Sequence, residues 1–169
     1  VRKNTFSNYK IKNIKNENYN MNREEAICTV LSSFENNSCF ISTTGKASRE
    51  VYEYRKRNNF SNEKDFLTVG GMGHTSQIAL GIAINKPHKK VICIDGDGSA
   101  LMHLGGLGLV GNIKPTNLIH VIINNGSHDS VGGQPTIGYS LIFSDLAQTL
   151  NYNYSFRVDN INDLKRTIS

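Results

Sequence analysis

Two short motifs place oxygen-bearing side chains at the ends of two apolar segments. Gly96-Asp97-Gly98 follows the apolar run 90–94, and Asn124-Asn125 follows the apolar run 118–123. Carboxylate and carboxamide oxygens, with a nearby backbone carbonyl, suit Mg²⁺ or Ca²⁺ and not zinc, and Mg²⁺ usually completes its shell with phosphates and water. A helix beginning near Ser99 offers free N–H groups and a positive dipole end. The motifs therefore predict a diphosphate held between a divalent metal ion and a helix N-terminus.

The elements that must carry these motifs alternate between strands and helices. Strands are expected at 38–42, 66–69, 90–94, 118–123 and 154–158, and helices after an Asn22 cap, at 48–57, at 76–84 behind a Thr75 cap, at 100–111, at 145–150 and from 162. This alternation predicts an α/β fold, with an open parallel sheet, right-handed crossovers and helices on both faces. Ligands bind such sheets beyond the carboxyl ends of the strands, where most of the glycine clusters fall.

The paired motifs resemble the cofactor-binding motif of the thiamin-diphosphate-dependent 2-oxoacid decarboxylases, which is G-D-G followed by about 25 residues and N-N. The resemblance implies that Asp97, Asn125 and the carbonyl of Ser127 bind Mg²⁺. It also implies that the turn at Gly96, Gly98 and Ser99 binds the diphosphate of thiamin diphosphate. G-D-G by itself also occurs in ordinary turns, so the resemblance depends on its spacing from N-N.

Two further loops resemble cofactor-binding loops of the same family. Gly70-Gly71-Met72-Gly73 resembles a G-x-Φ-G loop, in which a bulky apolar residue wedges the cofactor into a bent shape and the first carbonyl accepts from its aminopyrimidine. The resemblance assigns these roles to Met72 and Gly70, beside Gly71, although Met72 could equally be a core methionine. Thr43, Thr44, Gly45 and Lys46 occupy the place of the family's first diphosphate-contacting loop, with a solvated lysine as the alternative for Lys46.

Longer strings narrow the resemblance to the phosphonopyruvate decarboxylases, with the sulfopyruvate decarboxylases as the near alternative. The strings are 42–46, 66–74, 94–105 and 124–136, and the resemblance covers 22–159. It implies decarboxylation of 3-phosphonopyruvate to phosphonoacetaldehyde and CO₂. A desolvated phosphonate needs several donors. We expect His128 and Gln134 to act on the substrate, with Ser130, Lys46 and His74 as further candidates to meet its charge.

The resemblance also implies that the chain needs a partner. The family's activating Glu lies on a separate pyrimidine-binding domain, and no acid here sits in a matching motif. We expect that domain to come from a longer polypeptide or another subunit, and the assembly to be a homo-oligomer. Residues 1–21 are expected to be a linker or disordered lead-in, and 22–169 the cofactor-binding domain, truncated at both ends relative to the full enzyme. In that reading the family's final strand lies beyond Ser169.

Composition argues against several other classes of function. The net charge of +5 comes from basic residues scattered among Asn, without the aromatic interleaving of a nucleic-acid surface. The odd number of three cysteines, without C-x-x-C spacing, indicates reduced thiols in the cytoplasm and not a disulfide framework or zinc site. Since no apolar run approaches the length of a transmembrane helix and no signal peptide opens the chain, we expect no membrane partner.

Two patterns match other sites only superficially. Residues 106–111 spell the dinucleotide motif G-x-G-x-x-G, but they fall inside an expected helix and not between a strand and a helix start. His74, His103 and His128 do not have the spacing of zinc ligands. A non-catalytic module that holds a diphosphate between a metal ion and a helix N-terminus in the same way stays open as an alternative.

Overall fold

Strands and helices alternate along residues 20–34 and 38–169, which are the part of the chain that the computed structural model describes. The strands are β1 (Ser38–Ser42), β2 (Asp65–Leu67), β3 (Lys90–Gly96), β4 (Leu118–Ile123), β5 (Ser127–His128) and β6 (Gln134–Pro135). The helices are α1 (Arg23–Ser33), α2 (Lys46–Arg57), α3 (Thr75–Asn85), α4 (Asp97–Met102), α5 (Gly105–Ile113), α6 (Phe143–Thr149) and α7 (Ile161–Ile168), with 3₁₀ turns at Asp129–Val131 and Gly138–Ser140. Of the expected lead-in, residues 1–19 lie outside the described part.

The main sheet has the order β2-β1-β3-β4, and each neighbouring pair is parallel. All four carboxyl ends therefore share one edge, which confirms the expected open parallel α/β fold. The chain leaves β1 toward β2 on one side and returns to β3 on the other. Open sheets bind ligands at such a reversal. Thr43 N donates to Ile94 O at 2.8 Å, so the loops after β1 and β3 begin side by side.

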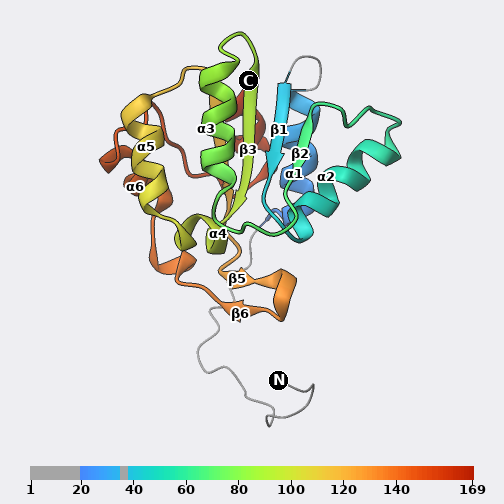
Figure 1. Ribbon diagram of the computed structural model, residues 1–169. Coiled ribbons are helices and arrows are strands. Elements are labelled where there is room, and N and C mark those ends of the chain that lie inside the picture. Colours follow the sequence, from blue (N-terminus) through green and yellow to red (C-terminus); the bar gives the residue numbers. More distant parts are fainter. Residues whose placement is uncertain (1–19, 35–37) are drawn as a thin grey trace.

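Helices cover both faces of this sheet, as Figure 1 shows. On one face, Ile27, Val30 and Leu31 of α1 pack with Val51 of α2 and Leu164 of α7 against Phe40, Ile92 and Ile94. On the other face, Ala79 and Ala83 of α3 pack on Ile41, Val91 and Cys93. Alternate residues of β1 and β3 thus serve opposite cores, which is why these strands read as continuous apolar runs.

Local capping chemistry fixes the start of α1. Asn22 Oδ1 accepts from Glu25 N at 2.9 Å, and Glu25 Oε2 accepts from Asn22 N at 2.9 Å, which makes a reciprocal capping box. The next helix, α2, begins at Lys46, two residues before the expected start. Gly45 precedes it at φ +100°, a backbone conformation that favours glycine.

Two expectations about helices were wrong. Thr75 does not cap α3 but is its first residue, fully buried, and His74 occupies the cap position without a side-chain hydrogen bond. The single helix expected at 100–111 is two helices, because the chain leaves helical geometry at His103, at φ −129° and ψ 53°. Gly73 approaches the His103 ring so closely that a Cβ there would collide with it, so tertiary packing sets the break.

One expectation about strands was also wrong. Residues 154–158 form no strand, and Tyr154 and Phe156 are 82% and 66% exposed. Strand preference depends strongly on tertiary context, so a segment with strand-forming residues need not pair. The strand at 118–123 is present, but every residue of β4 is half-buried and none is fully buried. β4 is the last strand of the described sheet, so one flank lacks a neighbouring strand.

Within residues 20–34 and 38–169, each helix is too short or too polar to cross a membrane.

Candidate functional site

Four loops converge at the carboxyl edge of the sheet, where Figure 1 shows α4 beside the small β5-β6 hairpin. They are 43–46 after β1, 68–74 after β2, 96–99 after β3 and 124–140 after β4. All the residues that the sequence analysis singled out for chemistry lie in these four loops or at the first turns of the helices that follow them. The parallel topology has therefore gathered them at one end of the domain.

Asp97 is a buried carboxylate at the start of α4, with 2% of its surface exposed. Burial raises its pKa above the ordinary value, while the hydrogen bond from Thr136 Oγ1 and backbone N–H groups partly oppose that rise. Lys and Arg side chains make no hydrogen bond to it within the described residues. A carboxylate taken out of water without a cationic side-chain partner is well suited to a metal ion, which supplies the missing charge.

Further oxygens converge on Asp97 above Gly138. A Cβ at Gly138 would collide with Asp97 Oδ2 and Asn124 Oδ1 and press on Thr136 Oγ1. Asn124 Nδ2 donates to Gly138 O at 2.8 Å, which aims the amide oxygen. These donors are all oxygens, the set that Mg²⁺ prefers. Sequence analysis had not singled out Asn124, although it is the first Asn of the N-N pair, nor Thr136.

The other two predicted ligands lie in the next turn of the same loop. Asn125 Oδ1 accepts from Ser127 N at 3.2 Å, and the Asn125 carbonyl accepts from Tyr139 Oη at 2.7 Å. Within the described residues no hydrogen bond or ion pair joins Asp97 to Asn125. The structure thus places Asn125 and Ser127 on the loop that also carries Asn124, while Thr136 donates to Asp97 and the Asn124 amide oxygen borders the same space above Gly138.

Ser99 connects the three loops expected to hold the diphosphate. Its Oγ accepts from Thr43 Oγ1 at 3.0 Å and from Gly73 N at 3.1 Å, which leaves its own hydroxyl hydrogen available to donate. Next to it, a Cβ on Gly98 would meet the His128 ring at 2.6 Å. The predicted residues Gly98, Ser99 and His128 are therefore neighbours, and Gly96 precedes them as the residue before α4.

The glycine loop after β2 is joined to the first loop. Gly70 N donates to Thr44 Oγ1 at 3.1 Å, and Gly70 and Gly71 both have positive φ values, of +78° and +58°. Met72 is half-buried between them and Gly73, so it is neither a core methionine nor a free surface residue. His74 turns away toward the α4–α5 junction, where its ring stacks on His103 with centroids 4.2 Å apart.

The loop after β4 contacts the start of α2. Lys46 Nζ lies 2.8 Å from Asp129 Oδ2, and Lys46 N donates to Ser130 Oγ at 3.0 Å. A Cβ on Gly45 would collide with Ser130 Oγ, so glycine allows the close approach. Gln134 is exposed in β6, opposite His128 of β5. Sequence analysis had not identified Asp129, which is the ion-pair partner of Lys46.

Asp95, a buried carboxylate near the end of β3, lies inside the fold two residues before Asp97. Asp95 Oδ2 is 3.5 Å from His120 Nε2, a distance for an ion pair and too long for a hydrogen bond, and both side chains are almost fully buried. The Cys93 thiol lies beside them, and burial raises its pKa well above the ordinary value. His120 Nδ1 also meets Tyr152 Oη at 3.3 Å. These contacts connect β3, β4 and the segment after α6.

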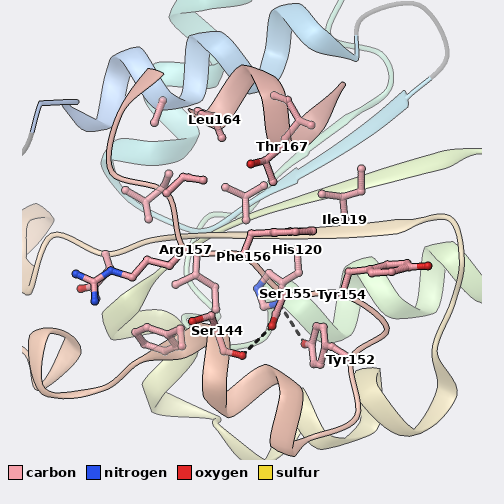
Figure 2. A pocket seen from close by; sticks show the side chains of 18 of the residues that line it. Ile119, His120, Ser144, Tyr152, Tyr154, Ser155, Phe156, Arg157, Leu164 and Thr167 are labelled. Carbon is pink, nitrogen blue, oxygen red and sulfur yellow. Dashed lines mark hydrogen bonds between the residues drawn. The ribbon is translucent and has the colours of Figure 1, made fainter. Parts of the chain in front are cut away.

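A cavity of about 1210 Å³ runs along the unpaired flank of β4. In Figure 2 its wall carries Ile119, His120, Tyr152, Tyr154, Phe156 and Leu164. Ser155 Oγ donates to Ser144 O at 2.9 Å across its floor. The cavity is lined largely by apolar groups along the sheet and reaches the carboxyl edge at Asn124, Asn125, Gly138 and Tyr139. Its position marks a side of the domain where the sheet lacks a neighbour.

Comparison with known proteins bears on this arrangement. Residues 42–168 match the family model of the thiamine pyrophosphate enzyme, C-terminal TPP binding domain. The chain is 35% identical over 147 residues to phosphonopyruvate decarboxylase of Streptomyces viridochromogenes, covering 87% of the chain and 36% of that protein. It is 45% identical over 96 residues to sulfopyruvate decarboxylase subunit beta of Methanocaldococcus jannaschii, covering 57% of the chain and 48% of that subunit.

Solved structures agree at the level of the fold. Benzoylformate decarboxylase from Polynucleobacter necessarius superposes with a TM-score of 0.67 at 15% identity, covering 88% of the chain and 30% of that structure. The chain spans about a third to a half of the length of these relatives.

Proposed function

The chain belongs to the C-terminal TPP-binding domain family of the thiamine pyrophosphate enzymes, with thiamin diphosphate as its cofactor, and from this we propose that it is the diphosphate- and Mg²⁺-binding part of a 3-phosphonopyruvate decarboxylase. The product would be phosphonoacetaldehyde and CO₂. The observation that carries the metal assignment is the buried Asp97 carboxylate, which faces other oxygens and makes no hydrogen bond to a Lys or Arg side chain within the described residues. The Streptomyces relatives, named phosphonopyruvate decarboxylases, support the choice of substrate.

We assign the metal to Asp97, Asn125 and the carbonyl of Ser127, with Asn124 and Thr136 shaping the space around Asp97. The short distance along the chain between Asn124 and Ser127 means that a small turn of one loop can present several oxygens. Mg²⁺ bound there would neutralise Asp97 and hold the diphosphate. The hydroxyl hydrogen of Ser99 and the N–H groups at Gly98 are the protein's own donors to that diphosphate.

The thiazolium ring of the cofactor supplies the electron sink for loss of CO₂. This chain's residues orient the cofactor and receive the substrate. Met72 is half-buried within a glycine backbone and would support the bound cofactor, with Gly70, Gly71, Thr44 and Gly45 beside it. His128, over Gly98, is the imidazole nearest the diphosphate turn and can hold or move a proton there.

The phosphonate of the substrate needs cationic and N–H donors, which Lys46, His128 and Gln134 offer from the same edge. Sulfopyruvate is the alternative substrate, favoured by the 45% identity to the methanogen beta subunit. A phosphonate carries up to two negative charges and a sulfonate carries one. We therefore expect the assembly to turn over 3-phosphonopyruvate with the higher kcat/KM.

The proposed enzyme requires a pyrimidine-binding domain in the same polypeptide or a separate subunit, and a homo-oligomer is the expected assembly. Support for a separate subunit comes from the relatives named as beta subunits. We also propose a cytoplasmic location, in keeping with three free cysteines. In this view the present chain binds cofactor but does not complete the reaction alone.

Activity measurements on the complete assembly and on this chain alone test the proposal. With thiamin diphosphate and Mg²⁺, the assembly should release CO₂ from 3-phosphonopyruvate, and His128→Ala or Gln134→Ala should lower kcat/KM. The chain alone should bind the cofactor without turnover. Preference for sulfopyruvate would transfer the assignment to the alternative, and unchanged catalysis in both variants would remove these residues from the site.

A further inference from the structure

A network of four charged side chains fastens the loop after β4 to helices α1 and α2. Arg23, the first residue of α1, donates to Glu50 of α2 through Nε, at 3.0 and 2.9 Å, and through Nη2, at 2.7 Å. Its remaining corner, Nη1, donates to Asp129 Oδ2 at 2.7 Å. Lys46 Nζ reaches the same Asp129 oxygen at 2.8 Å.

Glu50 holds the Arg23 side chain in place independently of Asp129. A planar guanidinium bound on two corners by one carboxylate has little freedom left, so Nη1 points in a set direction. Arg23 and Glu50 side chains are only 20% and 18% exposed. Asp129 therefore meets a preset partner, and its carboxylate lies between two cationic side chains, Arg23 and Lys46.

Three consecutive loop residues are held to the rest of the domain. His128 packs on Gly98, Asp129 binds Arg23 and Lys46, and Ser130 accepts from Lys46 N. The next residues behave differently: Val131 is 73% exposed, and Gly132 and Gly133 have φ values of +124° and +77°. The loop thus has a fastened stem at 128–130 and an exposed tip at 131–133, after which the exposed Gln134 pairs with His128.

We propose that Asp129 is a positioning residue for substrate binding: it fastens the stem to Arg23 and aims Lys46, so that His128 and Lys46 face the anionic end of a 2-oxoacid together. This inference rests on the proposed function for the identity of the substrate, but the fastening of the stem is independent of it. Without Asp129, Lys46 loses its partner and the stem loses its link to α1. The ligand class is a 2-oxoacid carrying a second, tetrahedral oxyanion.

The test compares Asp129→Asn with Glu24→Gln in the complete assembly. Glu24 is a matched control, because its 2.9 Å ion pair with Arg57 also joins α1 to α2 but is exposed on both sides. Asp129→Asn should raise the KM for 3-phosphonopyruvate about tenfold, the loss of one charge-assisted hydrogen bond, with a smaller change in kcat. Decarboxylation of pyruvate, which lacks the second anion, should change much less. Asp129→Glu should recover part of the KM.

Amide hydrogen exchange on the same proteins without substrate gives the second readout. Residues 127–139 should exchange about tenfold faster in Asp129→Asn than in wild type, and at the wild-type rate in Glu24→Gln. Arg23→Gln should reproduce that effect. Unchanged exchange in this loop would overturn the proposal, as would equal losses with pyruvate and 3-phosphonopyruvate. If wild type decarboxylates neither, the proposed function fails, and exchange still decides whether Asp129 fastens the stem.

Discussion

Thr43 Oγ1 donates a 3.0 Å hydrogen bond to Ser99 Oγ, which joins the loop after β1 to the first turn of α4. Because Gly73 N donates to the same oxygen, three loops from different parts of the sequence meet at one hydroxyl. Ser99 is buried, so this oxygen depends on protein partners and not on bulk water. The arrangement leaves one hydroxyl hydrogen for a ligand, and it pre-orders the site before any ligand arrives.

Replacing Asp97 by Asn should stabilise the metal-free fold while weakening metal binding. Burial raises the pKa of Asp97, so the folded, metal-free chain binds this proton more tightly than the unfolded chain. The contribution of Asp97 to the free energy of unfolding is largest when the pH is below the pKa of Asp97 in the unfolded chain. It is lost as the pH rises through the higher pKa of Asp97 in the folded chain. Asp97→Asn should therefore melt at a higher temperature than wild type at neutral pH without Mg²⁺, and the difference should shrink in acid.

The same variant should lose the metal. Titration calorimetry with thiamin diphosphate and Mg²⁺ should show affinity at least roughly 100-fold weaker in Asp97→Asn. Mutating residues that only support a metal ligand lowers metal affinity up to about 100-fold, and losing the ligand itself should cost no less. Asp145→Asn, on the exposed start of α6, is the control and should bind as wild type does. Equal affinity in the two variants would remove Asp97 from the metal site.

Gly138→Ala should disturb the metal edge by steric pressure alone. The added Cβ would meet Asp97 Oδ2 and Asn124 Oδ1. We expect Mg²⁺-dependent cofactor affinity to fall about 10- to 100-fold, as it does when supporting groups are moved. Gly81→Ala in α3 is the control: nothing lies near its Cβ, and an exposed helix position should gain up to about 1 kcal/mol. Calorimetry and thermal melts measure both.

Removing Arg55 should destabilise the domain far more than removing Arg57. Arg55 binds Asp65 through Nε at 3.0 Å and Nη2 at 3.1 Å, and the two side chains are 7% and 1% exposed. Arg55→Met leaves Asp65 charged in the interior, so urea unfolding should show a loss of about 3 kcal/mol. Arg57→Met breaks only an exposed pair and should leave the midpoint unchanged. Similar losses in both variants would contradict the role of burial.

Local sequence determined the elements whose signals are short-range. The Asn22–Glu25 capping box set the start of α1, and the apolar runs at 90–94 and 118–123 became β3 and β4. Motif spacing placed Asp97 and Asn125 at the same edge of the sheet, because parallel strands end together. The strand expected at 154–158 did not form, although the flank of β4 beside it is open, because strand preference depends on tertiary context.

Tertiary structure decided which groups actually meet. The sequence paired Asn125 with Asp97 as metal ligands, and the fold adds Thr136, which donates to Asp97, and Asn124, whose amide oxygen faces the same space above Gly138. The break of the expected helix at His103 follows from its packing against Gly73. Arg23 and Asp129 form an ion pair although they are 106 positions apart in the sequence, and no local sequence pattern predicts this pair. Spacing along the chain fixes which edge a residue reaches, but side-chain contacts depend on how separate loops pack together, and that is a property of the folded domain alone.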